Sequence, residues 1–311
     1  MEILVLHPGA LGDIILSLPA LSLLRQHYPQ AQLTIAGNHD YLNPVAIGCA
    51  DRTLSLSTIP LHRLYSTEPL SEDDVRFWGT YDRIVSWTGA GGPAFKSKLV
   101  KVGAKVKVSR WRPDSSEKRH VARIFVESLY PWIPRVESIS PPRIHVDPVR
   151  LDEARDWLTE REWTSGESIL ALHPGAGSVV KRWGIENFRS LAHRYLQQQI
   201  GKLLIVEGPA EVGLGRELVR DLTPACVLLL ESAPLFLLAA LLSFCRAYVG
   251  NDSGISHLAA GLGVPAVTIF GPTSPEQWVP LGERVTILRD SCLSRISPNH
   301  VWDALLGWGL C

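Results

Sequence analysis

The sequence lacks the features of secreted, membrane-spanning and nucleic-acid-binding proteins. Its cysteines are few, odd in number and contain no CxxC pair, which argues against a disulfide framework and a structural zinc site. They are Cys49, Cys226, Cys245, Cys292 and Cys311. Lys plus Arg balance Asp plus Glu at 31 each, so no excess of positive charge favours nucleic acid as a partner. The first apolar run, residues 3–6, is too short for a signal peptide and no basic residue precedes it, so we expect a cytoplasmic protein.

One largely apolar stretch, residues 225–245, has almost the length of a membrane span. Glu231, Ser232 and Pro234 interrupt it and leave a piece the size of a strand and a helix of about three turns. Pieces this short are typical of a buried core, so we expect no membrane-spanning helix here.

A chain of 311 residues exceeds the usual size of one hydrophobic core, which favours two domains. Short apolar runs alternate with amphipathic stretches, a pattern typical of parallel sheets covered by helices. We expect strands at 3–6, 32–36, 83–87, 105–108, 168–172, 202–206, 226–230, 247–249 and 266–270, and helices at 13–27, 94–102, 120–129, 151–161, 185–199 and 300–306. Five prolines between Pro131 and Pro148 predict a linker, hence domains 1–148 and 149–311. We expect the last segment to pack back on the first domain.

The pentapeptide Leu-His-Pro-Gly-Ala occurs twice, at residues 6–10 and 172–176. Each copy directly follows the first predicted strand of its half, which indicates a duplicated architecture. Ligands of open parallel sheets bind outside the carboxyl ends of the strands. Two such domains facing each other would therefore place both turns at a shared central cleft.

The first turn contains Gly9 and Gly12, which permit a tight bend and close approach of a ligand, and it leads into Asp13. Asp13 falls at the predicted helix start, where it has two interpretations. It either caps the helix, a common role of Asp, or presents a carboxylate that takes a proton from an acceptor hydroxyl. The chain lacks GxGxxG, which disfavours a nicotinamide dinucleotide site.

The second turn continues through Gly177, Ser178 and Lys181 into a predicted helix. A glycine-containing turn with backbone N–H groups and a cation suits a diphosphate, although it is not a Walker A loop. The alternative is a solvated loop with incidental basic residues.

The third segment lies after the predicted strand 247–249, where Asp252, Ser253 and Gly254 begin a helix. Helix N-termini attract anions, and His257 lies one turn beyond Ser253 on the same face. The loop containing Thr273 follows the next strand and is expected on the same rim.

Two weaker charge features remain. Glu211 follows the predicted strand 202–206, where it either accepts hydrogen bonds from ribose hydroxyls or occupies the first turn of a helix. Residues 96–123 contain ten Lys or Arg against only Asp114 and Glu117. This run is either a solvated face or a surface that attracts an anionic acceptor.

Together, the segments 7–21, 173–188 and 249–275 and the tail 292–305 resemble glycosyltransferase family 9, the heptosyltransferases. The resemblance covers almost the whole chain. It implies a GT-B fold, an α/β architecture of two Rossmann-like domains in which the C-terminal domain holds the donor. It also implies inverting transfer of heptose from ADP-heptose to the core of lipopolysaccharide, with no metal and no other cofactor.

By this resemblance Asp13 corresponds to the family's catalytic base and Lys181 to its phosphate-binding lysine. The segment 252–257 corresponds to the family's donor-binding motif, and Glu211 falls near its ribose-binding glutamate. His7 and Gly12 then lie on the acceptor side.

The chain departs from the family pattern at two places beside the expected acceptor. Leu16 stands where many members have histidine, and His7 stands where a basic residue often begins the first turn. The implied partners are a nucleotide-sugar donor and an anionic glycan or glycolipid acceptor, with peripheral association at the inner membrane surface. The alternatives on the same fold are a sugar-nucleotide epimerase and a non-catalytic binding protein; an epimerase would act on the sugar nucleotide without an acceptor.

Overall fold

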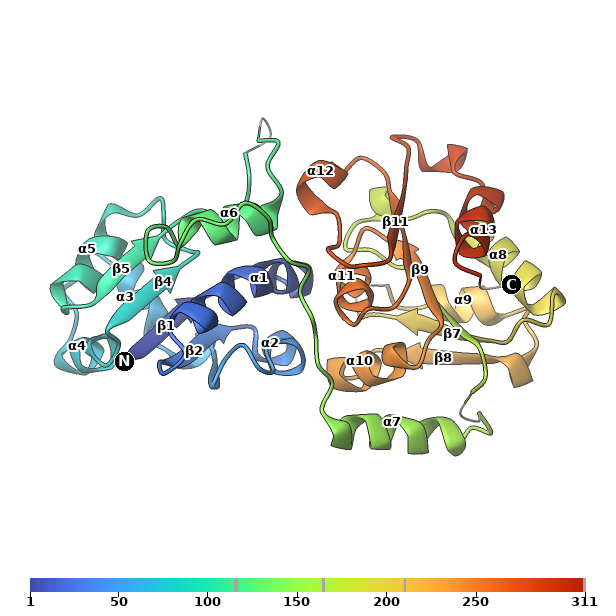
Figure 1. The fold of residues 1–311 in the computed structure, drawn as a ribbon, viewed down its shortest axis with the longest axis horizontal. Coiled ribbons are helices and arrows are strands. Elements are labelled where there is room, and N and C mark those ends of the chain that lie inside the picture. Colours follow the sequence, from blue (N-terminus) through green and yellow to red (C-terminus); the bar gives the residue numbers. More distant parts are fainter. Residues whose placement is uncertain (115–116, 164–165, 210, 310–311) are drawn as a thin grey trace. The chain divides into compact units, whose positions relative to one another are not determined.

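The chain folds into two compact α/β units, Met1–Pro142 and Arg143–Cys311 (Figure 1). This computed structural model describes residues 1–114, 117–163, 166–209 and 211–309. Ala210, which lies in the segment before Glu211, and Cys311 therefore fall outside the described residues. Each unit is a wholly parallel sheet with helical connections, so the predicted fold class of two Rossmann-like domains is confirmed.

The first unit has a five-stranded sheet of order β3-β2-β1-β4-β5. Its elements are β1 (Glu2–Leu6), α1 (Leu11–His27), β2 (Gln32–Gly37), α2 (His39–Val45), β3 (Arg52–Ser55), the 3-10 turn η1 (Leu56–Thr58), α3 (Leu61–Tyr65), α4 (Glu72–Gly79), β4 (Arg83–Ser86), α5 (Pro93–Lys101), β5 (Lys105–Val108) and α6 (Val121–Ser128). Helices α1 and α6 pack against each other.

The second unit has a six-stranded sheet of order β11-β10-β9-β6-β7-β8. Its elements are α7 (Pro148–Thr159), β6 (Ile169–His173), η2 (Val179–Lys181), α8 (Ile185–Gln197), β7 (Lys202–Glu207), α9 (Leu214–Val219), η3 (Pro224–Cys226), β8 (Val227–Glu231), α10 (Leu235–Ser243), β9 (Ala247–Asn251), α11 (Gly254–Gly261), β10 (Ala266–Phe270), α12 (Pro275–Trp278), β11 (Val285–Arg289), η4 (Leu293–Arg295) and α13 (Pro298–Leu306).

Both sheets reverse their strand order at the first strand of the unit. In the first unit β1 lies between β2 and β4, and in the second unit β6 lies between β7 and β9. Such a reversal leaves a crevice at the carboxyl ends of the two central strands, which is where doubly wound sheets bind ligands. The first Leu-His-Pro-Gly-Ala turn follows β1, the second follows β6, and the segment 252–257 follows β9. The topology thus gathers the predicted motifs of the second unit at one point.

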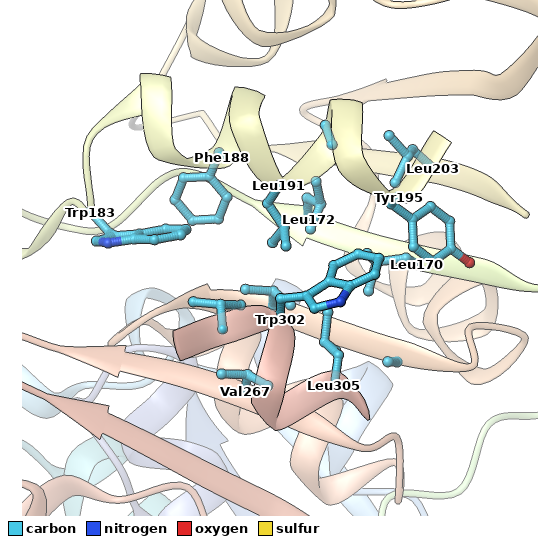
Figure 2. Packing of buried hydrophobic residues seen from close by; sticks show 14 of the residues in the cluster. Leu170, Leu172, Trp183, Phe188, Leu191, Tyr195, Leu203, Val267, Trp302 and Leu305 are labelled. Carbon is cyan, nitrogen blue, oxygen red and sulfur yellow. The ribbon is translucent and has the colours of Figure 1, made fainter. Parts of the chain in front are cut away.

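The core of the second unit explains why its last segment folds where it does. Apolar residues of α8 recur at helical spacing, and Phe188, Leu191 and Tyr195 pack over the central strands (Figure 2). Trp302 and Leu305 of α13 join the same cluster (Figure 2). The apolar face of this last segment is therefore buried in the core of its own unit, and its packing on the first domain stays a prediction.

The boundary between the units also differs from the expected one at residue 148. The second unit begins at Arg143, and the Ile144 N–H already donates to the Gly261 carbonyl, 2.9 Å away. The predicted linker therefore contains the boundary, but its end belongs to the second unit.

Two strands, β3 and β11, were not expected from the sequence. Both are edge strands, and their residues are only partly buried or exposed, so they lack a continuous apolar run. The apolar stretch 225–245 forms η3, β8 and α10, in agreement with its expected division. Within the described residues, no helix combines the length and the apolar character needed to span a bilayer.

Two neighbouring leucines of α13 test how this helix is anchored. Leu305 is 2% exposed and Leu306 is 44% exposed. We expect Leu305→Ala to lower the free energy of unfolding by about 2–5 kcal/mol, because it opens a cavity in the core. The matched Leu306→Ala should change it by less than about 1 kcal/mol. Urea denaturation measures both, and equal effects would contradict the assignment of α13 to this core.

Candidate functional site

The first turn is built around a buried histidine at the carboxyl end of β1. His7 has no exposed surface, and its backbone N–H donates to the Ala36 carbonyl at 2.8 Å. Its ring lies among aromatic side chains, with centroids 5.2 Å from Trp87 and 5.4 Å from Phe125. Burial lowers the pKa of His7 to about 4, so the ring is neutral at pH 7.

Asp13 follows this turn as the third residue of α1, because the helix begins at Leu11 and Ala10 is its N-cap. Asp13 is therefore not the N-cap residue itself, the first of its two interpretations, but lies at position N3. Its Oδ2 accepts the N–H of Ala10 at 2.9 Å, so it satisfies a helix-end donor from inside the first turn. The side chain is 8% exposed, and the positive end of the helix dipole favours its negative charge. Gly12, half-buried, precedes it.

The second turn makes a different connection. His173 ends β6 and is buried, and its Nδ1 lies 3.3 Å from the Ser253 Oγ at the start of α11. Burial, with the charge of Arg182 as a smaller cause, lowers the pKa of His173 to about 4. This histidine therefore links the second turn to the segment that follows β9.

Asn251, the last residue of β9, connects its strand to the loop after β6: its side chain bonds backbone groups of that loop. Its Nδ2 donates to the Pro174 carbonyl at 2.9 Å and to the Gly175 carbonyl at 3.1 Å. Its Oδ1 accepts the Trp183 N–H at 2.9 Å. The fully buried side-chain amide of Asn251 thereby holds both ends of the loop that carries Lys181.

Lys181 and Asp252 form an ion pair at this point. The Lys181 Nζ lies 2.7 Å from the Asp252 Oδ2, and the side chains are 32% and 7% exposed. Sequence reasoning selected both residues but did not expect them to pair. The loop residues Gly177 and Ser178, before Lys181, are exposed.

Helix α11 begins after Ser253, whose hydroxyl lies near other side chains and does not cap the helix. Ser253 is the N-cap, yet its side chain accepts no hydrogen bond from the first-turn amides. Its Oγ instead lies 3.3 Å from His173 Nδ1 and 3.4 Å from the Ser256 Oγ. The helix N-terminus therefore presents its amides without a side-chain cap. His257 is buried in the same helix, and Thr273 lies half-buried in the turn after β10, the neighbouring strand.

Glu211 lies in the loop between β7 and α9, so its expected alternative in the first turn of a helix is wrong. Its carboxyl group packs against the second turn: a Cβ atom added to Gly175 would come within 2.5 Å of the Glu211 Cδ. Burial raises the pKa of Glu211, and the charge of Arg182 opposes this rise. The strand-end carboxylate Glu207 is instead bonded to the N–H groups of Gly213 and Gly215.

Comparison with known proteins agrees with this arrangement. The family model of glycosyltransferase family 9 (heptosyltransferase) matches residues 138–299, which is more than half of the chain. The chain belongs to glycosyltransferase family 9. It is therefore a glycosyltransferase, as the three sequence motifs predicted.

Individual relatives of this glycosyltransferase extend the match beyond its second unit. A lipooligosaccharide heptosyltransferase 2 of Haemophilus ducreyi is 24% identical over 319 residues, covering 93% of this chain and 88% of the relative. That of Haemophilus influenzae is 29% identical over 176 residues, but the match covers only 55% of this chain and 51% of the relative. The solved ADP-heptose lipopolysaccharide heptosyltransferase II of Escherichia coli has the same fold, with a TM-score of 0.78, 19% identity and coverage of 99% and 98%.

The glycosyltransferase thus has its predicted donor residues in one unit and its predicted base in the other. Lys181, Asp252, Ser253 and Glu211 lie around the β6–β9 reversal, whereas Asp13 follows β1. The described part of the chain contains no group of three His, Cys, Asp or Glu side chains placed to hold a metal ion.

Sequence reasoning missed Asn251 as a residue of this site. Asn251 lies within the segment 249–275, two residues beyond the predicted strand 247–249, but nothing local to it identifies bonds to residues 174, 175 and 183. A buried polar residue at the carboxyl end of a central strand is the signal that could have found it.

Proposed function

We propose that this glycosyltransferase moves heptose from ADP-heptose to an anionic glycolipid acceptor of the lipopolysaccharide core. The observation that carries the proposal is the convergence of Lys181, the α11 N-terminus and Glu211 at the β6–β9 reversal of a family 9 chain. The names of the relatives support heptose as the sugar, and the name of the similar Escherichia coli structure supports ADP-heptose as the donor.

The donor diphosphate would bind where positive charge and open amides meet. The first-turn amides of α11 and the ammonium of Lys181 supply both, and a helix N-terminus is a favourable place for phosphate. Glu211, against the second turn, is placed to accept hydrogen bonds from ribose hydroxyls. During transfer the same groups stabilise the charge that develops on the departing ADP, so we propose that no metal is required.

The acceptor reacts by a single displacement at the anomeric carbon. The bond from the acceptor oxygen to this carbon forms while the bond to the ADP oxygen breaks, which inverts the configuration. Asp13 takes the proton of the acceptor hydroxyl, and ADP leaves with the electron pair. This assignment requires the turns after β1 and β6 to contact the same substrate pair.

We further propose that the enzyme works in the cytoplasm, at the inner membrane surface. The described cysteines Cys49, Cys226, Cys245 and Cys292 are free, the usual state in that reducing compartment. The first unit has 16 Lys and Arg against 13 Asp and Glu. The second unit has the opposite imbalance, 15 against 18.

Some of the first unit's cations gather with aromatic rings, a combination that suits an anionic lipid surface. Arg83 lies 4.9 Å and Lys107 lies 5.4 Å from the Trp132 ring centroid. Burial lowers the pKa of Lys107, and the charge of Lys96, which is exposed on α5, lowers it further.

Asp13→Asn tests the proposed base with little change of shape. The amide can still accept the Ala10 N–H but cannot take a proton from the acceptor. We expect turnover to fall by about 10²–10⁴-fold while donor affinity stays nearly unchanged. Steady-state transfer assays measure this, with the melting temperature as the control for folding. A folded variant with wild-type turnover would show that Asp13 is not the base.

Nucleotide binding tests the donor site and its charge. ADP should raise the melting temperature more than UDP, GDP or CDP, because a ligand that binds the native state stabilises it. Lys181→Ala should reduce that shift. The matched Lys202→Ala should retain it, since Lys202 is paired with Glu167 at the amino end of β7, away from the carboxyl ends of the strands. EDTA should leave transfer unchanged. A larger shift of the melting temperature with another nucleotide would exclude ADP-heptose as the donor. Loss of transfer activity in EDTA would show that the reaction requires a metal.

Vesicle sedimentation tests the membrane proposal. We expect the full chain to sediment with vesicles that contain phosphatidylglycerol and not with pure phosphatidylcholine. Lys96→Glu should weaken this partition by about tenfold or more, because each basic residue near an anionic surface contributes roughly 1 kcal/mol. Arg220→Glu, an equal charge change at an exposed site of the second unit, is the control. Equal effects of the two reversals would contradict docking through the first unit.

A further inference from the structure

The His7 side chain acts as a hydrogen-bond acceptor inside the first turn. Its Nδ1 receives the N–H of Gly9, two residues along, at 3.0 Å. An N–H donor requires an unprotonated Nδ1, so the neutral ring carries its proton on Nε2. The geometry is that of a turn in which a side chain bonds the backbone two residues on, usually made by Asn or Asp.

The His7 ring and the Asp13 side chain both pack closely against Gly9. A Cβ atom added to Gly9 would lie 2.7 Å from the His7 Cε1, 2.5 Å from the Asp13 Cβ and 2.9 Å from the Asp13 Oδ2. The next amide, of Ala10, donates to the same Asp13 Oδ2 at 2.9 Å. Two successive backbone N–H groups therefore donate to two side chains: that of Gly9 to His7 and that of Ala10 to Asp13. The Ala10 N–H thereby connects the Gly9–Ala10 backbone to the carboxylate of Asp13.

The ring itself has little freedom to move. The backbone of His7 continues the sheet through its bond to Ala36, and the ring packs edge-on against Trp87 with an interplanar angle of 82°. Burial keeps His7 neutral at pH 7, so the acceptor nitrogen is available under ordinary conditions.

We propose that His7 is a positioning residue: through Gly9 it holds the turn that orients Asp13 for proton transfer. This inference rests on the proposed function, in which Asp13 is the base. A histidine that only fills the aromatic pocket would be replaceable by an apolar side chain, whereas a positioning histidine needs its acceptor atom.

Two substitutions separate these roles. His7→Leu fills the apolar pocket but has no acceptor, and His7→Asn offers Oδ1 to the Gly9 N–H in the same kind of turn. We expect His7→Leu to lower kcat by roughly 10–100-fold, the size of effect that misplacement of a catalytic group produces. The KM for the donor and the shift of melting temperature by ADP should stay unchanged. His7→Asn should recover most of the lost kcat.

A double variant and hydrogen exchange complete the test. In the Asp13→Asn background, His7→Leu should lower the rate no further, because residues that act through one another are not additive. Amide exchange of residues 7–13 should accelerate in His7→Leu and not in His7→Asn.

Four results would overturn the inference: wild-type kcat in His7→Leu, equal losses in both variants, full additivity with Asp13→Asn, or unchanged exchange. If the wild-type enzyme transfers no sugar from ADP-heptose, the proposed function fails. The exchange comparison still decides whether His7 holds the turn.

Discussion

The donor half of the site depends on one buried amide. Asn251 sits at the end of a central strand and satisfies three backbone groups that belong to a loop far from it in sequence. An apolar residue there would leave those groups buried and unpaired, at about 1–3 kcal/mol each. The loop that carries Lys181 is therefore anchored at both ends to the strand. The Gly-rich turn can thus be open to ligands while its ends stay fixed.

The strands that support both turns were readable from the sequence, because buried parallel strands need apolar residues on both faces. Strands β1 and β6 were expected within a residue of their observed bounds, and β5 and β10 at the observed bounds. The motifs therefore fell at the correct ends of the correct strands. Strand ends in a doubly wound sheet bind ligands, so the placement of most site candidates followed from position, whereas the roles of Asp13 and Lys181 came from the family resemblance.

The features that the sequence did not predict depend on contacts between residues far apart in the chain, and not on the local pattern of residues. The edge strands β3 and β11 have one neighbour each, and their partly exposed residues carry no continuous apolar run. The apolar face of α13 was evident, but periodicity does not say which core receives it. Lys181 and Asp252 are 71 residues apart, and only the pairing of β6 with β9 brings them together. Asp13 is not the cap residue because its helix begins at Leu11, two residues earlier than the apolar pattern predicted.

The Lys181–Asp252 pair has a consequence for the cycle of the enzyme. In the proposed donor site, Asp252 compensates the charge of Lys181 and restricts its ammonium group, so a diphosphate would meet a cation that has lost part of its freedom beforehand. Capture of the donor is then an exchange of counter-ions. Asp252, nearly buried, loses its partner when the diphosphate takes it, and two negative groups then compete for one positive charge. In the proposed reaction that competition would weaken the binding of the diphosphate, in ADP as well as in the donor. The same pair that prepares the site would therefore also limit how tightly it holds either nucleotide.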